Sequence, residues 1–153
     1  MSELHADPVD ILLVEDNPGD ARLAKEALNE SKLNNRLNIV TDGEKALKYL
    51  MKQDEFEETV TPDLILLDLN LPKIDGREVL EIIKEDEELK MIPVVILTTS
   101  HAEEDILKTY KLHANCYITK PLDLDQFMKV VQSIEDFWLT IVKLPCKNEY
   151  VSN

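Results

Sequence analysis

Hydrophobic residues along this chain occur either in short continuous runs or in longer stretches with helical spacing. Four runs are bounded by polar or turn residues and cover residues 9–14, 63–67, 93–97 and 115–118. Runs that are apolar almost throughout, rather than at every second position, are typical of strands buried on both faces of a parallel sheet. A weaker run at residues 37–40 is interrupted by Asn38 and fits a strand at the edge of that sheet.

Segments in which apolar residues recur with a helical period separate these runs. The first follows Asn17-Pro18, a capping residue with proline at the first helical position. The other four are expected to begin near or after these residues: Asp42, Asp75, Ser100 and Asp123, the last continuing to about Val142. Five strands that alternate with five helices predict an α/β domain, in which helices wrap a parallel sheet through right-handed crossovers.

Charge narrows the classes of partner. The 153 residues include 17 Lys and Arg against 31 Asp and Glu, a net charge of −14 with neutral histidines. A chain this acidic repels phosphate backbones and anionic headgroups, so we expect neither nucleic acid nor a membrane surface as a partner. We see no apolar membrane span, no signal peptide and no disulfide framework in the two cysteines, Cys116 and Cys146. These features predict one cytoplasmic domain.

Residues whose side chains can bind a ligand or take part in a reaction follow four of the predicted strands. Glu15 and Asp16 stand after the first, Asp68 after the third, Thr98 after the fourth and Lys120-Pro121 after the fifth. In doubly wound α/β sheets, ligands bind outside the carboxyl ends of the strands. We therefore expect three carboxylates, one hydroxyl and one ammonium group to converge at one edge of the sheet.

This combination of groups suits a metal ion and a phosphoryl group. Three neighbouring carboxylates repel one another, and a divalent cation relieves the repulsion. Mg²⁺ favours a few carboxylates together with water and substrate oxygens. Lys120 would neutralise one phosphoryl oxygen, and the Thr98 hydroxyl would donate a hydrogen bond to another. Taken singly, the same residues would be read as helix caps and a surface lysine.

In type, order and approximate separation, these residues resemble the signature of the response-regulator receiver domain of two-component signalling, a CheY-like domain. The resemblance covers about residues 8–142. It implies a flavodoxin-like (βα)5 fold, a doubly wound parallel sheet with strand order 2-1-3-4-5. It also implies that Asp68 accepts a phosphoryl group from the phosphohistidine of a partner histidine kinase.

The same resemblance assigns roles to the surrounding residues. Glu15 and Asp16 match the acidic pair that binds Mg²⁺ with Asp68, and Asn70 matches the position whose backbone carbonyl completes the metal shell. Mn²⁺ or Ca²⁺ would be able to replace Mg²⁺. Thr98 matches a switch hydroxyl, Tyr117 an aromatic rotamer switch, and Lys120 the lysine beside the phosphoryl group. The peptide bond before Pro121 matches one that is usually cis.

A narrower likeness is to single-domain regulators that are partnered with phytochrome-type kinases. It rests on these segments: residues 66–72, 76–80, 95–101, 115–117 and 137–139. The likeness implies a phytochrome-type histidine kinase as the partner. Thr99 is a departure, because many receivers have a small residue after the switch hydroxyl, and threonine would crowd the phosphoryl pocket.

We expect no output domain after the predicted receiver domain, and we therefore expect the signal to pass through protein contacts. The last helix has one apolar stripe predicted to face the sheet: Leu124, Met128, Val131 and Trp138. It has a second apolar stripe beyond that one: Phe127, Val130, Ile134, Phe137 and Ile141. A broad face that covers the sheet margin is one interpretation. The other is a homodimer interface formed by this helix and a tail of residues 143–153.

Three other functions compete with this hypothesis. A phosphatase of the Asp-x-Asp type would need an acid where Asn70 stands, and a flavin or nucleotide domain would need a glycine-rich loop that three scattered glycines do not supply. A phosphorylation-independent adaptor on the same fold remains the alternative, although it would not need the acids and the lysine. We therefore expect a phosphoacceptor signalling protein rather than an enzyme with a separate substrate.

Overall fold

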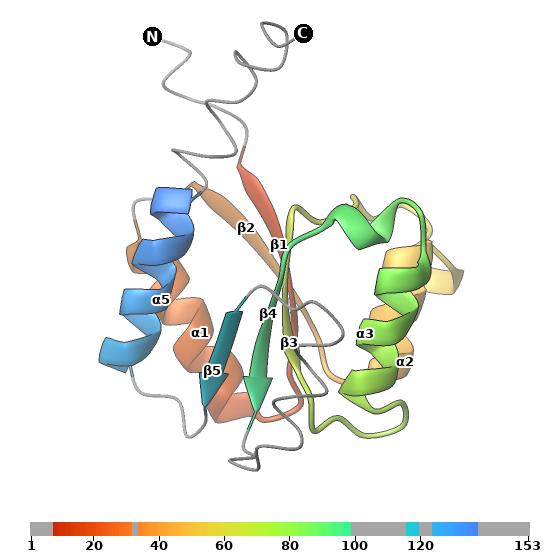
Figure 1. Cartoon of the computed structure of the whole chain (residues 1–153), viewed down its shortest axis with the longest axis horizontal. Coiled ribbons are helices and arrows are strands. Elements are labelled where there is room, and N and C mark those ends of the chain that lie inside the picture. The colour runs from red at the N-terminus through yellow and green to blue at the C-terminus, as the bar shows by residue number, and fades with distance from the viewer. Residues whose placement is uncertain (1–7, 32–33, 99–115, 120–123, 138–153) are drawn as a thin grey trace, which may run out of the picture.

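The computed structural model describes residues 8–31, 34–98, 116–119 and 124–137. Five strands form one sheet in the order β2-β1-β3-β4-β5, and every pairing is parallel (Figure 1). The bounds of the strands are β1 Val9–Val14, β2 Asn35–Val40, β3 Leu64–Asp68, β4 Val94–Thr98 and β5 Cys116–Thr119. The predicted fold class and strand order are confirmed. The bounds differ slightly from the prediction, since β2 begins two residues earlier and β3, β4 and β5 each begin and end one residue later.

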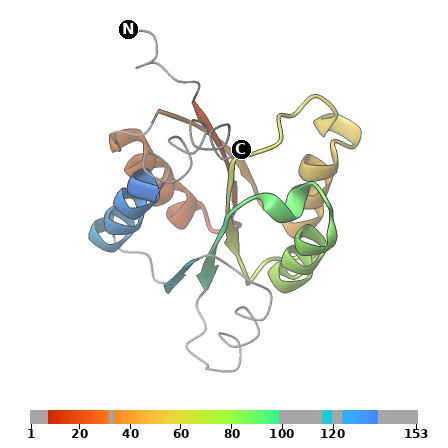
Figure 2. The ribbon, with the colours of Figure 1, turned by 45° about the horizontal axis from the view of Figure 1, so that its top comes forward.

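Helices cover both faces of the sheet. They are α1 Pro18–Glu30, α2 Gly43–Met51, α3 Gly76–Glu85 and α5 Leu124–Phe137, with short 3-10 helices at Asp54–Phe56 and Leu89–Met91. Helices α1 and α5 lie on one face and α2 and α3 on the other, as both views show (Figures 1 and 2). The helix expected after Ser100, and the part of the last helix beyond Phe137, lie outside the described residues.

The core is divided between the two faces of the sheet. All six residues of β1 are buried. Ile11 and Leu13 belong to the hydrophobic cluster beneath α1 and α5, whereas Leu12 and Val14 belong to the cluster beneath α2 and α3. Successive side chains of a strand point to opposite faces, so a strand covered on both sides is apolar at nearly every position. This explains the continuous apolar run in the sequence.

The three helices that follow β1, β2 and β3 each begin at a capping side chain. In each case a capping side-chain oxygen accepts a hydrogen bond from a backbone N–H group in the first turn. The pairs are Asn17 with the N–H of Asp20 at 2.9 Å, Asp42 with that of Lys45 at 2.8 Å and Asp75 with that of Arg77 at 3.0 Å. Each cap satisfies an N–H group that the first helical turn leaves without a partner. The predicted helix starts are confirmed, and each start lies shortly after the carboxyl end of a strand.

One ion pair explains the acidic residue inside the first apolar run. Asp10 in β1 is in register with Arg36 in β2. The Arg36 Nε donates to Asp10 Oδ1 at 2.9 Å and its Nη2 to Asp10 Oδ2 at 3.3 Å. Because β2 is an edge strand, the long arginine side chain can remain partly in water while its guanidinium neutralises the largely buried carboxylate.

The last helix is rotated relative to the sequence prediction. Phe127 was assigned to the outer stripe, but it is fully buried in the cluster beneath α1 and α5. Of the residues assigned to the sheet face, Met128 packs against this cluster as predicted, but Leu124 is 39% exposed. Two apolar stripes at helical spacing look alike in a sequence, and only the docking of α5 on α1 decides between them. The side chains of Val130, Ile134 and Phe137, and all of Ile141, lie outside the described residues.

We expect Phe127→Ala to lower the free energy of unfolding by about 3–5 kcal/mol, because it removes a fully buried aromatic ring and leaves a cavity. Leu124→Ala on the same helix should cost below about 1 kcal/mol, because the residue is largely exposed. Urea denaturation followed by circular dichroism measures both values. Equal losses for the two variants would contradict this packing of α5.

Candidate functional site

Three carboxylates meet at the carboxyl edge of the sheet. Glu15 and Asp16 directly follow β1, and Asp68 is the last residue of β3. These strands are neighbours, and Val14 is in register with Leu67. The three carboxyl groups each offer an oxygen atom, and these oxygens lie within 4.8 Å of one another. The structure therefore brings together the acidic residues that the sequence analysis assigned to a metal site.

Two of the three carboxylates are shielded from water. Glu15 and Asp68 are each 1% exposed, whereas Asp16 is exposed. A buried carboxylate is costly unless hydrogen bonds or counter-charges compensate it. The Asn17 N–H donates to Glu15 Oε2 at 3.1 Å, and the Asn70 N–H donates to Asp68 Oδ1 at 2.9 Å. Each donor lies two residues beyond its acceptor, so the turn that leaves each strand folds back on its own acid.

The set of donor atoms suits a small divalent cation. Three carboxylates within 4.8 Å repel one another when all are ionised, and burial of two of them strengthens the effect. Mg²⁺ takes hard oxygen ligands and usually keeps several waters. Because Asp16 is open to solvent while Glu15 and Asp68 form the inner side, the cluster can hold a cation and still admit water and a phosphoryl oxygen.

The next two strands carry other predicted site residues. Strand β4 pairs with β3 and ends at Thr98, one position beyond the residue in register with Asp68. Strand β5 pairs with β4 and contains Tyr117. The backbone therefore brings Thr98 to the same edge as the acids. The side chains of Thr98 and Tyr117, and the whole of Lys120 and Pro121, lie outside the described residues, and their roles stay predictions.

Asn70 lies in the β3–α3 loop, residues 69–75, which a glycine contact closes. The Gly76 N–H donates to the Leu69 carbonyl at 3.1 Å. A Cβ atom on Gly76 would lie 2.3 Å from the Asp68 carbonyl oxygen and 2.6 Å from Leu69 Cα. Any larger residue at this position would therefore displace the backbone at Asp68. The absence of a side chain at Gly76 fixes the start of α3 against the end of β3.

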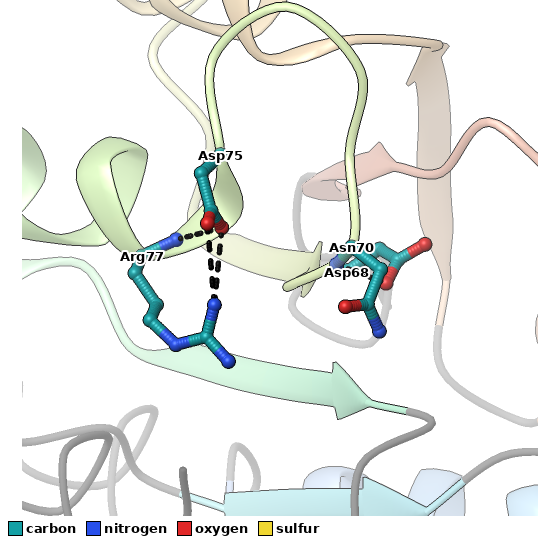
Figure 3. A network of polar contacts seen from close by, with 4 residues as sticks. All are labelled: Asp68, Asn70, Asp75 and Arg77. Carbon is teal, nitrogen blue, oxygen red and sulfur yellow. Dashed lines mark hydrogen bonds and ion pairs between the residues drawn. The ribbon is translucent and has the colours of Figure 1, made fainter.

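An ion pair holds the far end of this loop. Asp75 caps α3, and its carboxylate also binds the Arg77 side chain, with Nη1 at 3.2 Å from Oδ2 (Figure 3). Figure 3 shows Asp68 and Asn70 close together where the loop begins, with this pair where it ends. Arg77 is half-buried, so the pair is better shielded from solvent than most surface pairs. The pair fixes the first turn of α3 in addition to the cap.

Sequence reasoning gave no role to Gly43 or Gly76. Each follows directly after a capping aspartate, in the pairs Asp42-Gly43 and Asp75-Gly76. A cap needs only the acid, and glycine is a poor residue within a helix. A glycine at the first helical position is therefore a signal for a close backbone approach, which the structure has at both positions.

Among the helices that the structure describes, none is both long and apolar enough to cross a lipid bilayer.

Comparison with known proteins places the chain in a family. The family model described as the response regulator receiver domain matches residues 11–132. The chain is 52% identical over 145 residues to the response regulator Rcp1 of Synechocystis sp., covering 95% of this chain and 99% of that protein. It is 42% identical over 133 residues to a probable methanogenesis regulatory protein, FilR2, of Methanothrix harundinacea, covering 87% and 85%.

The chain is also similar to solved structures of response regulators. The crystal structure of a phosphorylated cyanobacterial phytochrome response regulator, RcpA, is 53% identical with a TM-score of 0.79, covering 87% of this chain and 95% of that chain. The crystal structure of the Mn²⁺-bound form of Rcp1 is also 53% identical with a TM-score of 0.79, covering 88% and 96%.

We expect Asp16→Asn to change stability in opposite directions with and without metal. Without metal, the variant should be at least as stable as the wild type, because one of three repelling charges is gone. With Mg²⁺ at 100 times its dissociation constant, the wild type should gain about 2.7 kcal/mol and the variant much less. Thermal denaturation with and without Mg²⁺ measures both effects.

Asp20→Asn is the matched control, since Asp20 lies in the first turn of α1 but outside the cluster. It should keep the stabilisation by Mg²⁺. An Asp16→Asn variant that Mg²⁺ stabilises as much as the wild type would contradict the metal site.

Proposed function

The chain belongs to the response regulator receiver domain family, and from this premise we propose that it accepts a phosphoryl group on Asp68 with the help of a divalent cation. The observation that carries the proposal is the cluster of Glu15, Asp16 and Asp68, whose oxygens lie within 4.8 Å at the carboxyl edge of the sheet. A phosphoacceptor must be a nucleophile beside a source of positive charge, and this cluster offers both a carboxylate and a cation site.

In the proposed transfer, a carboxylate oxygen of Asp68 attacks the phosphorus of a kinase phosphohistidine in line with the phosphorus–nitrogen bond. The new phosphorus–oxygen bond forms as that bond breaks, and the electron pair leaves with the imidazole nitrogen. The Asn70 N–H, which donates to Asp68 Oδ1 at 2.9 Å, orients the carboxylate. Lys120 and Thr98 contribute an ammonium group and a hydroxyl to the phosphoryl oxygens.

Glu15, Asp16, Asp68 and the Asn70 carbonyl would hold the cation, which we propose to be Mg²⁺. When bound, it would neutralise charge on the transferring group. The burial of Glu15 and Asp68 supports this assignment, because electrostatic interactions are stronger in a site from which water is partly excluded. Mn²⁺ would substitute for it, a proposal supported by the crystal structure of the Mn²⁺-bound form of the related regulator Rcp1.

The proposed donor is a phytochrome-type histidine kinase. Similarity to Rcp1 and to a phytochrome response regulator, at 52% and 53% identity, supports this partner. We further propose that the chain is a cytoplasmic signalling protein, which catalyses only its own phosphorylation and slow dephosphorylation. Thr98 and Tyr117 would convert the phosphorylated state into a changed protein-binding surface.

Two further predictions concern the boundaries and assembly of the domain. We propose a receiver domain of residues 8–142 and a tail of residues 143–153. Self-association through the last helix and this tail remains a proposal with a reduced set of residues, because Phe127 belongs to the core.

An adaptor that works without phosphorylation is the competing function, and it requires neither the acid cluster nor its burial.

We expect Asp68→Asn to abolish uptake of phosphate from a radiolabelled phytochrome-type kinase in the presence of Mg²⁺, because the amide is a far weaker nucleophile than the carboxylate. Phosphotransfer gels with the purified proteins measure the labelled fraction. Asp125→Asn makes the same change at an exposed position in the first turn of α5 and should leave uptake unchanged. Labelling of Asp68→Asn at the wild-type level would refute the assignment of Asp68, and a wild type that takes up no label would favour the adaptor.

A further inference from the structure

The β3–α3 loop is anchored by its apolar side chains beneath α2 and α3. Leu69 is 1% exposed and belongs to the hydrophobic cluster there. Leu71 and Ile74 are half-buried and pack against the same cluster. Asn70 lies between two of these anchors and is exposed. The position of the Asn70 backbone therefore depends on how the loop rests on the α2–α3 layer.

The first residue of α2 is pressed against this loop. A Cβ atom on Gly43 would lie 2.1 Å from the Ile74 carbonyl oxygen and 2.9 Å from its carbonyl carbon. The Gly43 N–H points to the Pro72 carbonyl at 3.4 Å, a long and weak hydrogen bond. By contrast, the nearest atom to a Cβ on Gly19, in the first turn of α1, would be a side-chain oxygen at 3.2 Å. The seating of α2 on the loop thus requires glycine at position 43.

The residue between these two contacts has an unusual backbone. Lys73 has a φ of 68°, in the left-handed region that lysine rarely adopts. Its Nζ lies 3.6 Å from Glu44 Oε1, the residue next to Gly43. Both side chains are largely exposed, so the ion pair itself contributes little stability. The strained backbone persists because the contacts on either side of it determine the path of the loop.

We propose that Gly43 is a positioning residue for the metal centre. The inference rests on the proposed function, in which the Asn70 carbonyl is a metal ligand. Gly43 contacts Pro72 and Ile74, and these residues set the path of the loop that begins at Leu69 and Asn70. The first turn of α2 therefore helps to hold the proposed ligand through the path of the loop.

A displacement of the Ile74 backbone cannot be absorbed at an end of the β3–α3 loop, because both ends of the loop are fixed. The loop closes on itself, because Gly76 binds Leu69 and lies against the Asp68 carbonyl. An atom added at Gly43 would push the Ile74 carbonyl by about 1 Å to reach a normal contact distance. Because Gly76 ties the end of the loop to its start at Leu69, the shift must pass into residues 69–73, which include the proposed ligand.

Gly43→Ala tests this role through metal affinity rather than through phosphorylation. Isothermal titration of the full chain with Mn²⁺ and with Mg²⁺ gives the dissociation constants. We expect the variant to bind each metal about tenfold more weakly, the size of effect seen when residues that orient a metal ligand are changed. Gly19→Ala makes the same substitution near the start of a helix and should keep the wild-type affinity.

Loss of stability alone must be separated from loss of positioning. Ile74→Ala removes a half-buried anchor from the loop, and Leu37→Ala removes a half-buried leucine packed on the opposite face of the sheet. We expect similar losses of stability in urea denaturation but weaker metal binding only for Ile74→Ala. If Gly43→Ala does not fold, this pair still decides the question.

The possible outcomes distinguish the two proposals. Wild-type metal binding with unchanged affinity in Gly43→Ala and Ile74→Ala would overturn the positioning role and leave the proposed function intact. Equal weakening in Ile74→Ala and Leu37→Ala would also overturn it, because the effect would follow stability. A wild-type protein that binds neither metal would overturn the positioning role together with the metal-assisted transfer. Metal binding that weakens as expected, in a protein that Asp68→Asn fails to inactivate, would support positioning and refute only the phosphoacceptor.

Discussion

The parallel pairing of β1 with β3 in the middle of the sheet is the constraint on which the site depends. Val14 and Leu67 are in register, so Glu15 and Asp68 leave their strands side by side. Both faces of these strands are covered by helices, which buries the two acids at the strand ends. A register shift of one residue would turn every apolar side chain of a strand to the other face, so core packing also fixes the position of the acids.

The cluster of three carboxylates lowers the stability of the metal-free fold but creates a site for a cation. Two carboxylates, each 1% exposed, lie beside a third, and metal-free folding brings their charges together. Backbone N–H groups of Asn17 and Asn70 offset part of that cost, because each donates to a buried acid. A cation would offset more of it. The same features that make the metal-free site unfavourable therefore create the driving force for metal binding.

Most of the fold could be predicted from the sequence because it follows from local patterns. Continuous apolar runs identified the strands, and the caps Asn17, Asp42 and Asp75 identified three helix starts. The orientation of α5 could not be predicted, because Phe127 and Leu124 lie on apolar stripes of equal quality, and the choice depends on packing against α1.

The candidate site divides in the same way. Its acids could be predicted, since the carboxyl ends of neighbouring parallel strands meet at one edge. The contacts of Gly43 and Gly76 could not, because a close approach between segments depends on atoms from both of them. The sequence contains only the weak signal of glycine after a capping acid.

The alternation of β3 continues past the end of the strand and couples the site to the core. Leu67 and Leu69 belong to the cluster beneath α2 and α3, and Leu71 packs against it. Asp68 and Asn70, which lie between these anchors in the sequence, belong to neither hydrophobic cluster. One segment therefore carries core anchors and site residues in strict alternation. A change in how α2 and α3 pack on these anchors must therefore alter the affinity of the site for a cation. A bound cation must in turn stabilise that packing, because thermodynamic linkage acts equally in both directions.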